Sequence, residues 1–188
     1  MIAFCKRVGT VAEALAKCNQ VSYDGPVPYR PFTDQNCSVA GALEIVGERW
    51  TLLIMREVLF GRRRFAEIKR HTGVAPNILS DRLQMLVEHG LLRRKLYSEH
   101  PESYEYAPTR KGLDLNPVIL SLLRWGDQYA APAAGPPRVA VHKTCGHDTV
   151  PELHCSVCGE ELRTGEMEVR PGPGATEEQV AEGVLPRA

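Results

Sequence analysis

The sequence has no apolar run of the roughly 18 residues that a membrane-spanning helix needs. A helix-like stretch at residues 11–18 carries Glu13 and Lys17, and no signal-peptide pattern follows it. We therefore expect a cytoplasmic protein that makes no membrane contact. Because the cytoplasm keeps thiols reduced, the six cysteines fit free thiols or metal ligands better than disulfides.

The sequence also lacks recognisable catalytic motifs. It contains neither a His-Glu-x-x-His motif nor a nucleophile motif. A metal-dependent hydrolase would need an open metal position and a partnered base, so an enzyme is the weakest alternative. We predict no catalytic residues, and we find no internal repeat.

Net charge is absent as well, with 23 basic and 23 acidic residues, and this alone argues against nucleic-acid binding. The distribution argues the other way. Between residues 61 and 95, nine basic residues stand against three acidic ones, a net charge of +6. From residue 160 onward, seven acidic residues stand against three arginines, a net charge of −4. The neutral total conceals a basic centre and an acidic tail.

Composition divides the chain into five segments. Residues 1–35 are rich in proline near their end and are interpreted as a flexible arm. An ordered domain is expected at 36–131, and a Pro-Gly linker at 132–138. A small separate unit follows at 139–167, and a disordered acidic tail at 168–188.

Within the ordered domain, apolar residues recur at helical spacing in segments that end at glycines. Pro76 suits the first position of one helix. Thr109 suits the cap of the last helix, which Pro117 is expected to kink. The pattern predicts helices at 39–46, 50–60, 65–72, 76–89 and 110–129, with strands at 91–97 and 103–107.

This order of elements is how a chain builds a reader for the DNA major groove. The fold class is mainly α with a small β wing (α+β): a winged helix-turn-helix domain, followed by a small C-terminal zinc ribbon. The helix at 76–89 is the reading helix, because its short polar side chains lie near its N-terminus. Asn and Gln suit adenine edges, and Ser can serve any base. The predicted DNA-binding residues are Arg63, Arg64, Lys69, Arg70, Asn77, Ser80, Asp81, Arg82, Gln84, Arg93, Arg94 and Lys95.

The positions of these residues indicate which of them would contact bases and which would contact phosphates. Asn77, Ser80, Asp81 and Gln84 would face bases, and Arg82 lies to one side, where it would clamp phosphate. The basic residues of the hairpin would reach the backbone or the minor groove. The alternative is an ordinary solvated surface on a protein-interaction module. Salt-dependent affinity for duplex DNA separates these two interpretations.

The last helix carries an apolar face that is wider than one small domain needs. Ile119 and Leu123 broaden it. A face of this width suggests a second copy of the chain as its partner. The predicted dimerisation residues step by three and four, as in a coiled-coil seam: Leu115, Val118, Leu122, Trp125 and Tyr129.

A set of short motifs follows in order along the ordered domain: 37–40 (CSVA), 46–54 (VGERWTLLI), 61–65 (GRRRF), 79–83 (LSDRL), 86–91 (LVEHGL), 104–106 (YEY), 109–112 (TRKG) and 125–126 (WG). With these motifs, the segment from Cys37 to Tyr129 resembles the HxlR family of bacterial winged-helix transcriptional regulators, distant relatives of the MarR type. The resemblance covers half of the chain and implies a homodimer, with terminal helices at its seam, on an inverted-repeat operator. Repression, relieved by a small-molecule or redox signal, is the expected mode.

In some regulators of this family, a cysteine just ahead of the first helix senses oxidants or electrophiles. Cys37 occupies that position, where a helix N-terminus lowers a thiol pKa and makes the thiolate more available. Cys37 is therefore the redox-sensing candidate. The alternative is a small buried packing residue.

Two cysteine motifs in the small unit, 142–146 (HKTCG) and 155–159 (CSVCG), each place two ligands with two residues between them, directly before a glycine. Two such turns suit a tetrahedral zinc ion, whose binding would fold a unit with too little core. His147 and His154 are alternatives to His142. A redox dithiol in the second motif, or four unrelated residues, is the competing interpretation. The predicted ligands of this structural Zn²⁺ are His142, Cys145, Cys155 and Cys158.

Overall fold

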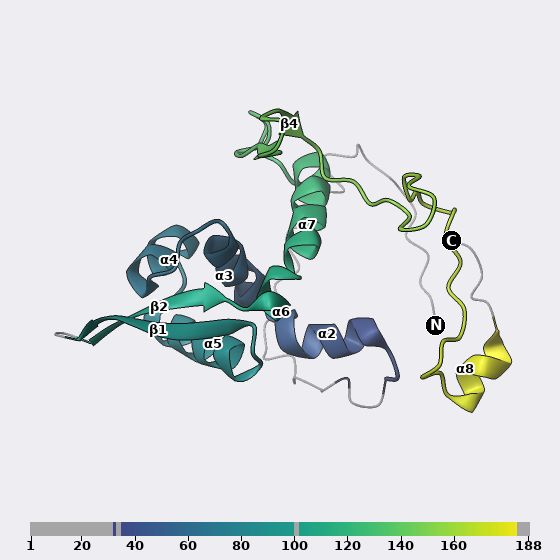
Figure 1. Ribbon diagram of the computed structural model, residues 1–188, viewed down its shortest axis with the longest axis horizontal. Coiled ribbons are helices and arrows are strands. Elements are labelled where there is room, and N and C mark those ends of the chain that lie inside the picture. The colour runs from purple at the N-terminus through teal and green to yellow at the C-terminus, as the bar shows by residue number, and fades with distance from the viewer. Residues whose placement is uncertain (1–31, 33–34, 100–101, 184–188) are drawn as a thin grey trace, which may run out of the picture. The chain divides into compact units, whose positions relative to one another are not determined.

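The computed structural model describes residue 32, residues 35–99 and residues 102–183. The predicted arm at 1–35 lies almost wholly outside the described residues. Figure 1 shows the order of the elements. The helices are α2 (Ser38–Val46), α3 (Arg49–Leu59), α4 (Phe65–Thr72), α5 (Pro76–Glu88), α6 (Arg110–Leu113), α7 (Asn116–Tyr129) and α8 (Glu177–Glu182), and the strands are β1 (Leu92–Glu99), β2 (Glu102–Pro108), β3 (Ala140–Val141) and β4 (Asp148–Thr149).

The hydrophobic core lies where α3, α4, α5 and the base of the β1–β2 hairpin meet. Apolar side chains from each element are fully buried there, with Ile54, Ile68 and Leu83 all at 0% exposure. A buried leucine or isoleucine contributes roughly 1.5–3 kcal/mol over an exposed one. This core fixes the angle between α4 and α5, and so it sets which side of α5 faces solvent.

The turn between α4 and α5 has the conformation that its sequence predicts. Gly73 ends α4 in the left-handed region at φ 72°, where a side chain would be strained. Pro76 then starts α5, where its missing N–H leaves no hydrogen bond unmade. Together these two residues reverse the chain within a few positions and confirm the helix-turn-helix.

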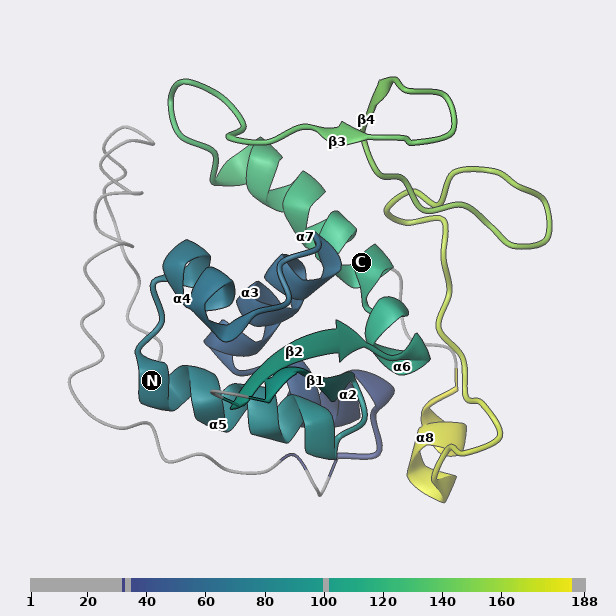
Figure 2. The ribbon, with the colours of Figure 1, turned by 60° about the vertical axis from the view of Figure 1, so that its left-hand side comes forward.

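The wing is an antiparallel hairpin of β1 and β2, with a bulge between Leu96 and Ser98. The chain just before α4 adds a short third edge. Arg64 forms a β-bridge with Glu105, and the Tyr106 N–H donates to the Arg63 carbonyl at 2.8 Å. Figures 1 and 2 both show β1 and β2 running alongside α5. The hairpin is thereby anchored to the helix-turn-helix at both of its strands.

The C-terminal helix of the domain differs from the prediction, because it is divided into α6 and α7. The Thr109 hydroxyl accepts a hydrogen bond from the Gly112 N–H at 3.2 Å, so it caps the four-residue α6 and not the long helix. The kink predicted near Pro117 takes the form of this break: the helix is interrupted at residues 114–115, and Pro117 lies in the first turn of α7, where proline is tolerated. A Cβ at Gly112 would collide with the Leu91 carbonyl, which explains the glycine at this junction.

The segment beyond the linker holds little regular structure. β3 and β4 pair antiparallel in a short hairpin within the predicted small unit. The tail at 168–188 was expected to be disordered throughout, yet it contains α8, where the Thr176 hydroxyl accepts from the Gln179 N–H. Among the described residues, no helix is both long enough and apolar enough to cross a membrane.

Candidate nucleic-acid interface

The reading helix α5 has one buried and one exposed side. Leu79, Leu83 and Leu86 are fully buried in the core. This leaves the polar residues of the first turns directed outward, as their sequence spacing predicts. The four predicted base-facing residues are all exposed: Asn77, Ser80, Asp81 and Gln84.

Gln84 has a neighbour that sequence reasoning did not include. Its side-chain Nε2 donates to Glu88 Oε1 at 2.8 Å, one helical turn further along α5. This bond restricts the rotation of the amide and leaves its oxygen and one N–H available. An amide that reads adenine needs one donor and one acceptor. The Gln84 amide retains one of each while it is bonded to Glu88. The i, i+4 spacing of the two residues is the signal that could have identified the pair.

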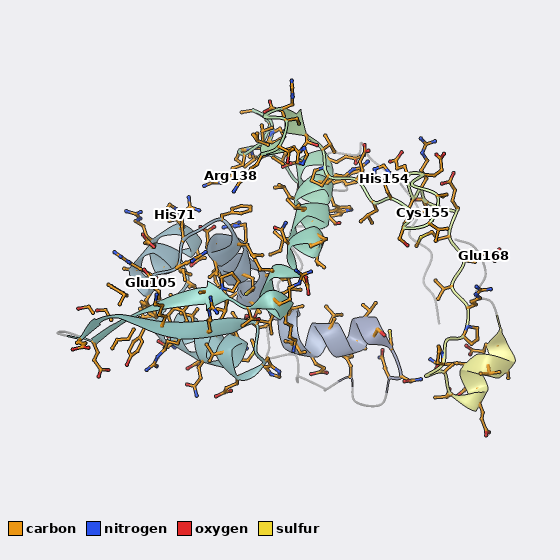
Figure 3. All side chains as sticks on the ribbon, in the orientation of Figure 1. His71, Glu105, Arg138, His154, Cys155 and Glu168 are labelled. Atoms are coloured by element: carbon orange, nitrogen blue, oxygen red, sulfur yellow. The ribbon has the colours of Figure 1, made fainter. Side chains whose placement is uncertain are left out.

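Basic side chains surround the exposed side of the helix-turn-helix and continue onto the wing. None of them is buried, in keeping with contacts to phosphates at the surface. His71, labelled in Figure 3, lies on α4 beside this group. The exposed basic residues are Arg63, Arg64, Lys69, Arg70, Arg93, Arg94 and Lys95.

Two of these arginines are held by aromatic rings of the wing. The Arg64 guanidinium lies 4.4 Å from the centroid of the Tyr97 ring, and its Nε is 3.6 Å from Glu105 Oε1. The Arg94 guanidinium lies 3.6 Å from the centroid of the Tyr104 ring. Stacking occupies the face of a guanidinium and leaves its edge for a phosphate, although at Arg64 part of that edge already pairs with Glu105. Tyr97 and Tyr104 therefore position two of the predicted DNA-binding arginines, contacts that sequence reasoning missed.

Arg82 occupies a different environment from the other predicted contacts. It is half-buried, and its Nε lies 3.6 Å from Glu48 Oε2, at the start of α3. Glu48 also accepts a hydrogen bond from the Trp50 N–H at 2.9 Å. Arg82 thus links α5 to α3 within the domain, and its contact with phosphate stays a prediction.

The apolar face of α7 is divided between the core and solvent. Ile119 is 5% exposed and packs into the core, and Leu115 packs partly against it. The remaining apolar residues form a separate exposed stripe, in which the Trp125 and Tyr129 rings lie 5.4 Å apart. We call this the α7 stripe: Val118 at 46%, Leu122 at 49%, Trp125 at 60% and Tyr129 at 65% exposure. Leu115 therefore contributes to the core more than to a dimer seam.

Cys37 immediately precedes α2 and is exposed to solvent. Its side chain makes no capping hydrogen bond, although its carbonyl accepts from the Gly41 N–H at 3.0 Å. The exposure contradicts the alternative of a buried packing residue. The thiol is accessible to a reagent, and its role as a sensor stays a prediction.

The predicted metal ligands form two pairs. His142 Nδ1 lies 3.3 Å from Cys145 Sγ. In the second pair, backbone N–H groups of Cys158 and then Val157 lower the pKa of the Cys155 thiol, because they stabilise its thiolate. Within the described part of the chain, no three His, Cys, Asp or Glu side chains lie close enough to share a metal ion.

Helices α2 to α5, the wing and α7 together define the class of fold, a winged helix-turn-helix. The chain belongs to the HxlR-like helix-turn-helix family of transcriptional regulators, and the profile of that family matches residues 45–134. It is therefore a DNA-binding regulator and not an enzyme, as the sequence predicts.

The likeness extends to individual proteins. An uncharacterized HTH-type transcriptional regulator of Mycobacterium tuberculosis is 50% identical over 137 residues, which cover 73% of this chain and 87% of the relative. The solved structure of PA1374, a candidate transcription factor from Pseudomonas aeruginosa, is 38% identical and superposes with a TM-score of 0.55 over 78% of this chain and 99% of that one. The structure of PA1607, also a candidate transcription factor, is 30% identical, with a TM-score of 0.64 over 73% of this chain and 96% of that one.

Proposed function

We propose that the protein is a repressor that binds an inverted-repeat operator as a homodimer, and that a small-molecule or redox signal weakens this binding. The observation that carries the proposal is the combination of an exposed reading helix with the α7 stripe. The reading helix would recognise one half-site. The exposed apolar side chains of the α7 stripe would be buried when two copies associate.

The α7 stripe supports a second copy of the chain as its partner. Its four side chains recur at intervals of four, three and four residues, which aligns them along one side of a helix. A straight stripe of this kind can pair with the same stripe on another copy, as a two-fold interface requires. It also lies outside the reading helix and the wing, so pairing would leave both free for DNA.

The contacts with DNA would follow from this pairing. Two symmetric heads place their reading helices in successive major grooves, about 34–36 Å apart, on the same side of the duplex. Asn77, Ser80, Asp81 and Gln84 would then face base edges, while the exposed arginines and lysines neutralise phosphates. A dimer held in this way near a promoter would exclude polymerase, which is why repression is the proposed mode.

The wing provides a test of the phosphate contacts. Arg94→Ala is expected to weaken binding to operator and to random duplex equally, because a phosphate contact carries no sequence information. The slope of log K against log salt should flatten by about 0.9 for each phosphate that is no longer neutralised. Fluorescence anisotropy over a range of salt concentrations measures both quantities.

Two further variants make this test specific. Arg94→Lys retains the charge but cannot stack in the same way, so it should restore most of the slope. Arg110→Ala removes an arginine of α6 that pairs with Asp114, and it should leave the slope unchanged. Identical slopes for wild type and Arg94→Ala would remove the wing from the interface.

The proposed redox signal has its own test at Cys37. A peroxide or an electrophile should lower operator affinity in wild type but not in Cys37→Ser, because only the exposed wild-type thiol can be modified there. Mass spectrometry of the treated protein identifies which cysteine reacted. If Cys37→Ser responds as wild type does, the reagent acts through another residue, such as one of the free cysteines at 145, 155 and 158, and Cys37 is not the sensor.

A further inference from the structure

The segment at 139–167 contains two short hairpins, and the first surrounds the His142 motif. Its strands β3 and β4 pair antiparallel, with Ala140 opposite Thr149. Between them, the His142 N–H donates to the His147 carbonyl at 2.9 Å, and the Gly146 N–H donates to the His142 carbonyl at 2.7 Å. Two backbone hydrogen bonds therefore close the turn, and His142 takes part in both, once through its N–H and once through its carbonyl.

The second hairpin repeats this pattern with every residue number raised by 13. The Cys155 N–H donates to the Glu160 carbonyl at 2.8 Å, and the Gly159 N–H donates to the Cys155 carbonyl at 2.9 Å. His154 and Glu161 form the flanking β-bridge. Figure 3 labels His154 and Cys155 at the start of this loop.

The two hairpins are thus a structural repeat of residues 140–149 and 153–162. Gly146 and Gly159 occupy equivalent positions and share a left-handed conformation, with φ of 73° and 78°. Sequence comparison misses the repeat because only this glycine and the cysteine before it are identical in both copies. The expectation that the chain has no internal repeat is therefore wrong at the level of backbone structure.

Packing does not explain why these hairpins form. No residue of 139–167 is buried, and Val157 is 93% exposed. Leu153 and Val141, at 54% and 53%, are also largely in solvent. An isolated two-stranded hairpin is marginally stable in water at best. Two copies of one tight turn without a core need another source of stability.

We propose that the two hairpins are metal-binding knuckles that together hold one Zn²⁺ ion in each chain. Each turn places its first and fourth residues at the same end of the hairpin, and these residues carry nitrogen or sulfur. Three thiolates and one imidazole fit a tetrahedral zinc ion with no position left for water, so the site is structural. The four ligands are His142, Cys145, Cys155 and Cys158.

The repeat also decides among the histidines. His142 is equivalent to Cys155, the first ligand of the other turn, whereas His147 is equivalent to Glu160, outside the ligand positions. His154 is engaged within its own hairpin, where its Nδ1 lies 3.0 Å from the Gly159 carbonyl oxygen. His142 is therefore the nitrogen ligand.

Zinc binding requires the two turns to approach each other, because no three ligating side chains lie together in the described residues. The hairpins are joined only by residues 150–152. Four peptide steps span at most about 14 Å, so the tether keeps the turns within reach. On binding, three S–H bonds break and their protons pass to solvent, while three Zn–S bonds and one Zn–N bond form.

The test measures zinc in the full-length reduced protein after dialysis against metal-free buffer. Wild type should retain about one ion per chain, and Cys158→Ser should retain almost none. Titration of metal-free protein with Zn²⁺ in weak buffer should release up to about three protons per chain. Limited proteolysis should cut 139–167 only when zinc is absent, because these hairpins have no buried core to hold them without the metal.

His142→Ala and His147→Ala form a matched pair that tests the ligand assignment. His142→Ala should lower zinc affinity by more than about 100-fold, since losing even a group behind a ligand costs about 10–100-fold. His147→Ala should bind zinc as wild type does. Equal losses in both variants would overturn the assignment. Zinc-free wild type, a Cys155–Cys158 disulfide in its place, or one ion per two chains would overturn the site.

Discussion

Leu122→Glu is expected to convert the proposed dimer into folded monomers. The Leu122 side chain is 49% exposed in the single chain, so a carboxylate there does not enter the core. In the proposed dimer, the same carboxylate would be buried against the partner's apolar stripe. An uncompensated buried charge costs about 3–5 kcal/mol, which is enough to separate the two copies.

The loss of the dimer should have a large effect on DNA binding. Linking two heads raises their joint affinity for two half-sites by roughly 10²–10⁴-fold over a single head. Leu122→Glu should lose this factor on the inverted repeat, yet it should bind an isolated half-site as wild-type heads do. Sedimentation velocity reports the oligomeric state, and anisotropy titration reports both affinities.

Gln128→Glu is the matched control for this variant. Gln128 is exposed on the same helix but lies about a quarter-turn away from the α7 stripe. The Gln128→Glu substitution adds the same charge to α7 and should leave the protein a dimer. If Leu122→Glu also stays a folded dimer, the interface between copies lies on another surface.

The second large effect is expected on sequence preference. The double variant Asn77→Ala with Gln84→Ala should bind random duplex as wild type does, because it changes no charge. Its preference for operator should fall by about 1–3 kcal/mol for each amide–base pairing that is removed, a factor of roughly 5–150 per pairing in each half-site. Competition between labelled operator and unlabelled random duplex measures this ratio.

A control for the reading helix comes from an amide outside it. Gln128→Ala removes an exposed side chain on α7 and should leave the preference intact. If the double variant still prefers operator as strongly as wild type, the bases are read by a surface other than α5.

The sequence predicts the helix-turn-helix well, because local signals and the hydrophobic pattern agree there. Gly73 and Pro76 each favour the conformation that they adopt, and the leucines of α5 leave one side for the core. The break between α6 and α7 is only partly predictable. Pro117 predicts a distortion at this point, but Thr109 is compatible with a cap on one long helix, and the close approach of Gly112 to Leu91 becomes visible only in three dimensions.

For the interface, the sequence predicts which residues face outward but not what holds them. Arg64 and Tyr97 are far apart in the chain, and only the folded wing brings them together. The same holds for Arg82, whose partner Glu48 lies on another helix. Exposure follows from periodicity within one helix, whereas these pairings depend on how separate elements pack.

Selection of bound sequences from a random duplex library tests the central claim most directly. A dimeric repressor should enrich one inverted repeat, with half-site centres one helical turn or a multiple of it apart, about 10–10.5 base pairs per turn. Mass measurement should find two chains on each selected duplex, and affinity should fall steeply with salt. Enrichment of no common sequence, or of a single half-site bound by one chain, would contradict the proposal that this protein reads an operator as a dimer.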